Sequence, residues 1–116
     1  MWVFCATGFY DLVMSDDPDV LVVGGRVRRD LERLQQLLLI LGHDPPEILD
    51  DAWGDYQFRV RLSRSACAEA LAALVAAIDY ENFVGAVEEV QGEHRALVCK
   101  KLALISTTLG EVEDDR

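Results

Sequence analysis

The chain has 116 residues, of which 51% are hydrophobic, and a formal net charge of -10. This length and hydrophobic content are typical of one globular domain and exclude a disordered chain. The acidic balance opposes non-specific binding to nucleic acid, and no apolar run approaches the roughly 18 residues that cross a bilayer, so we expect a cytoplasmic protein with no membrane partner.

The first third of the chain predicts antiparallel strands. Residues 2–6 and 9–14 are rich in aromatic and β-branched side chains, which favour strands. Thr7 and Gly8 interrupt this pattern, so it describes either one bulged strand or two strands. An Asp- and Pro-containing turn over 15–19 then leads to a further strand over 20–27.

A helix is predicted over residues 28–41. Its apolar stripe is formed by leucines at helical spacing: Leu31, Leu34, Leu38 and Leu41. Leu37, Leu39 and Ile40 widen the stripe, so the end of the helix should be buried nearly all round, and Gly42 is a suitable stop. The following segment, 42–55, has no periodicity and is long for a connection, which is typical of a functional or mobile loop.

Residues 56–63 alternate between two kinds of side chain. One face carries Tyr56, Phe58, Val60 and Leu62, and the other carries Gln57, Arg59, Arg61 and Ser63. This alternation predicts a strand with one buried and one exposed face.

Helical patterns fill the rest of the chain. A helix over 64–79, capped by Ser63, should pack through one set of residues: Cys67, Leu71, Leu74, Val75 and Ile78. Two further helices are expected over 84–90 and from Glu93 to about Leu109, and the second should turn Leu97, Leu104, Ile105 and Leu109 inward. We expect residues 1–110 to form a single α+β domain and residues 111–116 to form an acidic tail.

The order of these elements is β-β-α-β-α-α. It predicts an α+β fold, with an antiparallel sheet of three to four strands and helices on one face, as a ferredoxin-like relative. The other face of the sheet would then be open to solvent.

Two candidate binding sites follow from this arrangement. The first is the open sheet face, with Arg26, Arg59 and Arg61 beside either Trp2 and Phe4 or Val3 and Cys5, a surface that could stack bases or hold an anion. The simpler interpretation is that these arginines keep the face soluble and pair with acids.

The second candidate site lies at the corner between the predicted helices, where Asp79, Tyr80 and Asn82 follow one another closely. These side chains form a pocket only if they converge. The alternative is a structural corner in which Asn82 caps the next helix.

No pattern of catalytic residues, phosphate-binding loop or metal ligands is recognisable, and we therefore expect no catalytic residues, no metal site and no cofactor. The acidic clusters at 16–19 and 44–55 lack calcium-loop spacing. Cys5, Cys67 and Cys99 are widely spaced and are expected to be free thiols.

Four stretches together resemble a family of short bacterial proteins without an assigned activity. They are Met1-Trp2-Val3-Phe4 with Gly8-Phe9, Gly25-Arg26-Val27-Arg28-Arg29-Asp30-Leu31, Tyr56-Gln57-Phe58-Arg59-Val60-Arg61, and Ile78-Asp79-Tyr80-Glu81-Asn82-Phe83. Val84 stands where a lysine is usual in that family, and the 42–55 segment is longer. The resemblance supports the expected fold and implies no function.

The leading hypothesis is a small soluble binding or regulatory protein that acts through protein–protein contacts, as a homodimer or with a protein partner. A second is a nucleic-acid or nucleotide binder that uses the arginine-bearing face, although the net charge disfavours it. A third is a small enzyme with a pocket near Asp79, Tyr80 and Asn82, and the missing catalytic motifs argue against it.

Overall fold

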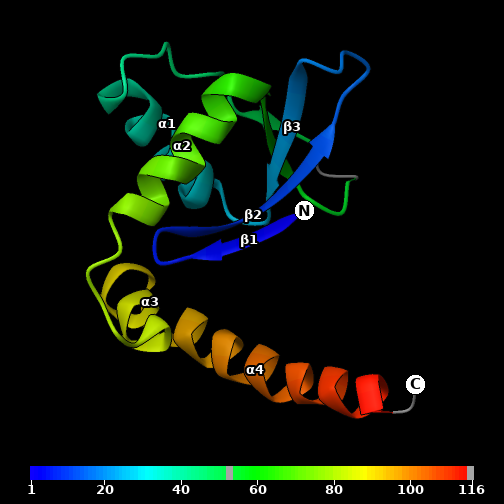
Figure 1. The fold of residues 1–116 in the computed structure, drawn as a ribbon. Coiled ribbons are helices and arrows are strands. Elements are labelled where there is room, and N and C mark those ends of the chain that lie inside the picture. Colours follow the sequence, from blue (N-terminus) through cyan, green and yellow to red (C-terminus); the bar gives the residue numbers. More distant parts are fainter. Residues whose placement is uncertain (52–53, 115–116) are drawn as a thin grey trace. The chain divides into compact units, whose positions relative to one another are not determined.

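The computed structural model describes residues 1–51 and 54–114, with side chains described as far as Thr107. Contacts within the chain group into two compact units, Met1–Asp79 and Tyr80–Arg116, and each unit is described by itself. Figure 1 shows the course of the chain through both. The expected single domain over 1–110 stays a prediction, because two compact units can belong to one folding domain.

The first unit is built on a five-stranded antiparallel sheet in the order β1-β2-β3-β5-β4 (Figure 1). Its strands are β1 (Trp2–Cys5), β2 (Gly8–Met14), β3 (Val20–Gly25), β4 (Leu49–Asp50) and β5 (Phe58–Ser63). The α+β class is therefore confirmed. The interruption at Thr7 separates two strands that pair as a hairpin, and β4 lies within the segment for which no regular structure was predicted. The ferredoxin-like relationship is not confirmed.

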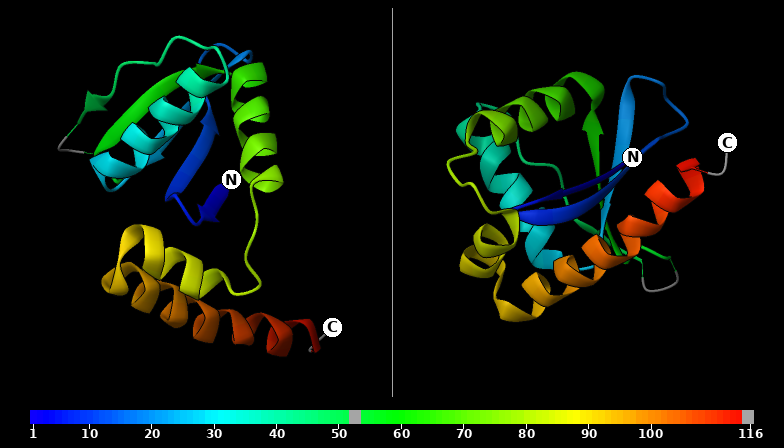
Figure 2. Two further views of the ribbon diagram at one scale, coloured as in Figure 1. Left: turned by 90° about the vertical axis from the view of Figure 1, so that its left-hand side faces the viewer. Right: turned by 60° about the horizontal axis from the view of Figure 1, so that its bottom comes forward.

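Two helices, α1 (Arg28–Ile40) and α2 (Arg64–Ala76), pack on one face of this sheet (Figure 2). The core between the layers contains these buried residues: Tyr10, Leu12, Val23, Leu31, Leu34, Leu38, Val60, Leu62, Ala66, Cys67 and Ala70. The alternation predicted for β5 is confirmed, since Val60 and Leu62 are buried while Arg61 is exposed. The sequence pattern therefore identified the inner face of β5 correctly.

The ends of the two helices agree only in part with the sequence analysis. Gly42 ends α1 as predicted: its φ is 90°, and the amides of Gly42 and His43 donate to the carbonyls of Leu39 and Leu38. The expected all-round burial of this end is wrong, because Leu39 and Ile40 are 63% and 81% exposed.

Helix α2 packs mainly through its first turns, where Ala66, Cys67 and Ala70 are buried. Small side chains bring this part of the helix close to the sheet. The expected packing of Val75 and Ile78 is wrong, since they are 68% and 54% exposed and Ile78 lies beyond the end of the helix. As predicted, Ser63 caps α2, and its hydroxyl accepts from the Ala66 amide at 3.1 Å.

The second unit is a pair of helices, α3 (Phe83–Gln91) and α4 (Glu93–Asp114), joined at Gly92 with a φ of 96°. Among the described side chains, Ala86 and Val87 of α3 and Ala96 and Cys99 of α4 are buried. Helix α4 continues to Asp114, within the stretch expected to form a tail.

The predicted inward face of α4 is wrong. Leu97, Leu104 and Ile105 are exposed, because the small residues of α4 face α3 instead. The side chain of Leu109, which was also expected to point inward, lies outside the described side chains. Of the described helices, none is both long and apolar enough to span a membrane.

Candidate interaction surface

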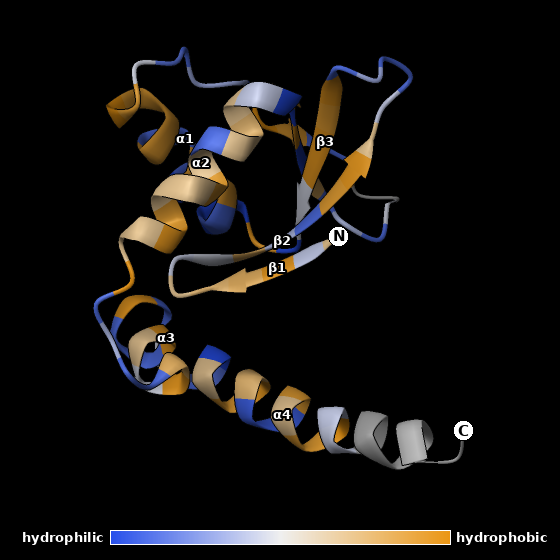
Figure 3. Cartoon of the chain, in the orientation of Figure 1, coloured by the Kyte–Doolittle hydropathy of each residue, from blue (hydrophilic) through white to orange (hydrophobic). Residues whose placement is uncertain are grey.

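The second face of the sheet is free of α1 and α2 and forms the candidate site, here called the open face. One row across this face contains Trp2, Asp11, Gly24 and Arg59. Each of these residues is the register partner of the one before it, on the neighbouring strand. Val13, Val22 and Arg61 form the next row. Figure 3 shows hydrophobic residues along much of β3, because its partly buried as well as its buried positions are apolar.

Three aromatic rings, called here the aromatic row, occupy the β1–β2 end of the open face. The Trp2 and Phe4 ring centroids are 6.3 Å apart with the planes inclined by 17°, and the Phe4 and Phe9 centroids are 4.8 Å apart. Trp2 is 69% exposed and Phe4 is 40% exposed. The sequence left open whether Trp2 and Phe4 or Val3 and Cys5 lie on this face, and the structure places Trp2 and Phe4 there. Large exposed aromatic side chains that stack on one another are typical of contact surfaces.

The arginines of β5 lie on the open face, and acids neutralise both of them. Arg61 Nη2 lies 3.1 Å from an Asp16 carboxylate oxygen, and this hydrogen bond holds the pKa of Asp16 below its usual value. Arg59 Nη2 lies 3.0 Å from an Asp51 oxygen, and Arg59 Nε donates to the carbonyl of Tyr56. The two guanidinium groups thus make the ion pairs that the simpler interpretation expects.

Arg26 and Tyr56 differ from their predicted placement. β3 ends at Gly25, so Arg26 lies one residue beyond it, with its guanidinium 4.8 Å from the Tyr56 ring centroid. Tyr56 was expected to face inward, but β5 begins only at Phe58. Tyr56 instead lies against Gly24, where an added Cβ would come within 2.9 Å of Tyr56 Cβ. The missing side chain of Gly24 makes the room that Tyr56 occupies.

A hollow of about 220 Å³ lies beside these residues on the open face. It is lined by Asp11, Val13, Val22, Gly24, Asp55, Tyr56 and Arg59. Two of its three charged side chains are acidic, and the third, Arg59, is paired with Asp51. This balance gives the hollow no surplus of positive charge for an anion.

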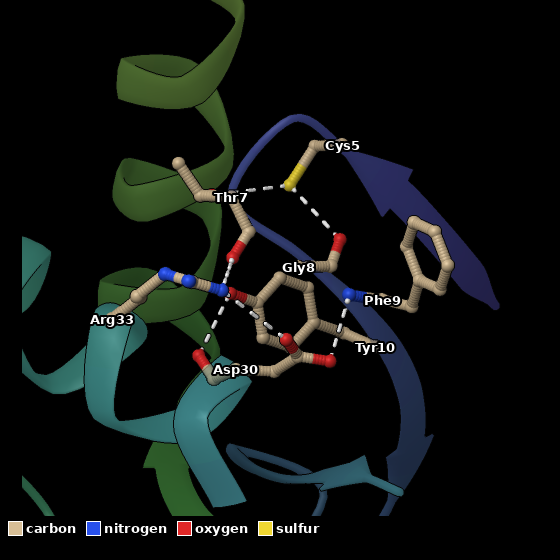
Figure 4. A network of polar contacts seen from close by, with 7 residues as sticks. All are labelled: Cys5, Thr7, Gly8, Phe9, Tyr10, Asp30 and Arg33. Carbon is tan, nitrogen blue, oxygen red and sulfur yellow. Dashed lines mark hydrogen bonds and ion pairs between the residues drawn. The ribbon is translucent and has the colours of Figure 1, made fainter. Parts of the chain in front are cut away.

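The hairpin that carries the aromatic row is fastened to α1 by a buried carboxylate. Asp30, in the first turn of α1, is 0% exposed and accepts a hydrogen bond from the Phe9 amide at 3.2 Å. Arg33 Nη1 lies 3.7 Å from the other Asp30 oxygen and donates to the Thr7 carbonyl at 3.2 Å. Figure 4 shows that the Phe9 ring points away from this network. The network therefore fixes the hairpin backbone and leaves the aromatic row on the other side.

Tyr10 and Gly8 complete this attachment (Figure 4). The Tyr10 hydroxyl donates to the Asp30 carbonyl at 2.9 Å. Burial, assisted by the nearby Cys5 and Asp30, raises the pKa of Tyr10 well above its ordinary value of 10.0. A Cβ added at Gly8 would lie 2.5 Å from the Tyr10 hydroxyl oxygen, so only glycine fits there without movement.

The raised pKa of Tyr10 predicts loss of stability in alkali. Above pH 10.0 the tyrosine of the unfolded chain ionises while that of the folded chain stays neutral, so stability is complete below this pH and falls as the pH rises. The expected slope is up to about 1.4 kcal/mol per pH unit. Urea unfolding followed by tryptophan fluorescence at several alkaline pH values measures it. Tyr10→Phe should be less stable at neutral pH and should have a shallower slope, whereas equal slopes would contradict the assignment.

Asp30 and Tyr10 were not among the functional residues predicted from the sequence. One signal was present: Asp30 precedes Leu34 by one helical turn, which places an acid on the buried stripe of α1. A charged residue at such a position needs partners inside the protein. One of those partners, the Phe9 amide, comes from the hairpin, and helical periodicity contains no information about it.

The residues of the predicted corner are partly explained by local structure. Asn82 caps α3 as expected, and its Oδ1 accepts from the Gly85 amide at 3.3 Å. The Tyr80 and Phe83 ring centroids are 6.5 Å apart. The boundary between the two compact units falls between Asp79 and Tyr80, so a shared pocket of these residues stays a prediction.

Among the described residues, no group of three or more histidine, cysteine, aspartate or glutamate side chains is placed to hold a metal ion. The fold and the open face thus define a small globular α+β protein with an exposed aromatic surface. Comparison with family models, curated proteins and solved structures finds no match to this chain. The resemblance to the short bacterial family stays an expectation.

Proposed function

We propose that the chain is a small, non-catalytic binding protein that contacts another protein through its open face. The observation that carries this proposal is the aromatic row of Trp2, Phe4 and Phe9, whose rings contact one another in sequence while Trp2 stays 69% exposed. Burying a large aromatic side chain against a partner contributes about 1.5–3 kcal/mol, so two such rings can dominate a small interface.

The charges of the open face suit a protein partner better than a nucleic acid. Arg59 and Arg61 already pair with Asp51 and Asp16, so the binding of phosphates through them competes with both ion pairs. The net charge of -10 adds repulsion of polyanions. Ion-paired residues on the same face as an aromatic row resemble instead the polar rim of a protein interface. The nucleotide-binding hypothesis therefore ranks second, and the proposed enzyme site at the corner ranks third.

Site-specific photo-crosslinking in cells tests the proposal. A benzophenone amino acid is placed at Trp2, on the open face, and in a separate variant at Leu39 on α1. The two positions form a matched pair, because their side chains are 69% and 63% exposed in the structure. After irradiation, the products are separated by mass and the joined peptides are identified by mass spectrometry.

We expect a discrete protein adduct from Trp2 that is at least several-fold more abundant than any adduct from Leu39. Equal yields at the two positions would mean random collision and would contradict a binding role for the open face. A nucleic-acid adduct specific to Trp2 would replace the proposal by the second hypothesis.

A further inference from the structure

β1 is an outermost strand of the described sheet, so the backbone groups on its outer side can pair with another strand. Met1 and Leu12 exchange two hydrogen bonds, each 2.8 Å long, between their amino and carbonyl groups. Bonded and non-bonded pairs alternate along an antiparallel ladder. Trp2 and Phe4, which are register partners of Asp11 and Phe9, therefore direct their N–H and C=O groups away from β2.

The two edges of the sheet differ in their protection. β4 has only two residues, follows Pro45 and Pro46, and includes Asp50, which accepts a side-chain bond from Gln57. Short length, proline and charge are the usual means of blocking an edge. β1 reads Trp-Val-Phe-Cys, with neither charge nor proline. The unprotected edge is therefore the one that borders the aromatic row.

We propose that β1 pairs with β1 of a second copy of this chain, antiparallel about a two-fold axis at Val3. This inference rests on the proposed function and names the partner. With Val3 opposite Val3 of the second copy, Trp2 lies opposite Phe4 of the second copy, and the outward N–H and C=O groups of both residues form four hydrogen bonds. The segment is complementary to itself because its bonding residues, Trp2 and Phe4, lie symmetrically around Val3.

The side chains agree with this register. Trp2 and Phe4 lie on the same face of their strand, so the aromatic row of one copy continues into that of the other. No charged side chain of β1 enters the contact. The net charge of -10 on each copy acts as a general repulsion, and salt should therefore strengthen the dimer by screening it. Binding to nucleic acid has the opposite dependence on salt.

Sedimentation velocity of the full chain over a range of concentrations tests this inference. We expect a monomer–dimer equilibrium whose dissociation constant falls as salt is added. Phe4→Ala and Phe4→Pro both remove the ring, but only proline also removes the outward N–H. Proline at an edge position of this kind leaves the bonds to β2 in place. Phe4→Pro should raise the dissociation constant by a further factor of about ten, since each copy loses one hydrogen bond.

Cysteine crosslinking tests the register without dependence on the proline variant. Val3→Cys places two thiols opposite each other at the two-fold axis, at a non-bonded pair where Cβ atoms approach most closely. Phe4→Cys, on the same strand, faces Trp2 of the second copy and serves as the control. On mild oxidation, Val3→Cys should form a covalent dimer several-fold faster than Phe4→Cys or the unchanged chain.

A sedimentation coefficient that keeps the value of a monomer at every concentration would overturn the inference. Equal formation of covalent dimer by Val3→Cys and Phe4→Cys would also overturn it. The photo-crosslinking experiment at Trp2 distinguishes a failure of the proposed self-pairing from a failure of the proposed function. An adduct with a different protein, together with a monomeric chain, removes the self-pairing and retains a binding role for the open face. A Trp2 adduct between two copies of this chain supports both.

Discussion

Asp30→Ala is expected to lower the free energy of unfolding of Met1–Asp79 by about 3 kcal/mol. The substitution removes the carboxylate that accepts from the partly buried Phe9 amide and faces Arg33. It also removes an acid from the first turn of α1, where the helix dipole favours negative charge. Urea unfolding followed by tryptophan fluorescence measures the change, because both tryptophans of the chain lie in this part of the sequence.

Two further substitutions serve as comparisons for this prediction. Glu32→Ala removes an acid of the same helix that is less buried than Asp30, and it should change stability by less than about 0.5 kcal/mol. Asp30→Asn retains an oxygen acceptor but loses the charge, so its effect should fall between the other two. A loss in Asp30→Ala no larger than that in Glu32→Ala would show that the network does not hold the hairpin.

Gly8→Ala is expected to destabilise the same unit by about 1–3 kcal/mol. The added methyl group meets the Tyr10 ring and hydroxyl at 2.7 and 2.5 Å and Asp30 Cβ at 3.1 Å. Neither neighbour moves easily, because the Tyr10 hydroxyl is bonded to the Asp30 carbonyl and both residues are buried. The strand must therefore shift away from α1. The same unfolding measurement detects the loss.

Gly85→Ala provides the matched control. Gly85 is helical and the nearest atoms to an added Cβ belong to Asn82, at 3.5 Å or more, which is ordinary contact. This variant should be neutral or stabilising by up to about 1 kcal/mol, since alanine favours a helix more than glycine does. Its unfolding should be followed by circular dichroism, because the second unit contains no tryptophan. If Gly8→Ala is as well tolerated as Gly85→Ala, then the close approach at Gly8 has no energetic consequence.

The two destabilising substitutions also connect the core to the proposed interface. Asp30 and Gly8 hold the turn between β1 and β2, and β1 carries the free edge and two rings of the aromatic row. Loosening of this turn should weaken dimerisation under conditions in which most of the chain remains folded. A positioning role of this kind is distinct from direct contact with a partner.

The regular patterns of the sequence were sufficient to identify most of the elements. Alternation in 56–63 separated Val60 and Leu62 from Arg59 and Arg61, and leucines at helical spacing identified the buried side of α1. The caps at Ser63 and Asn82 and the stop at Gly42 were also recognised correctly. These features depend on neighbours in the chain, and such neighbours are visible in a sequence.

The errors arose where the decisive neighbour was distant in sequence. Tyr56 lies on the open face because Gly24 leaves room for it, and β4 exists because it pairs with β5. In α4, Leu97 and Leu104 have the composition of a core face, yet they are exposed while the smaller Ala96 and Cys99 are buried. Local hydrophobicity cannot choose between two apolar faces of one helix.

The sequence by itself determined the α+β class, the inward and outward sides of β5, and the acidic character that disfavours nucleic acid. Only the tertiary structure decided which residues make up the candidate surface: Trp2 and Phe4 in place of Val3 and Cys5, with the arginines already occupied by Asp16 and Asp51. The physical reason is that periodicity follows from the geometry of a single element. Strand register, ion pairing across 45 residues of chain and the burial of Asp30 arise only when separate elements pack together.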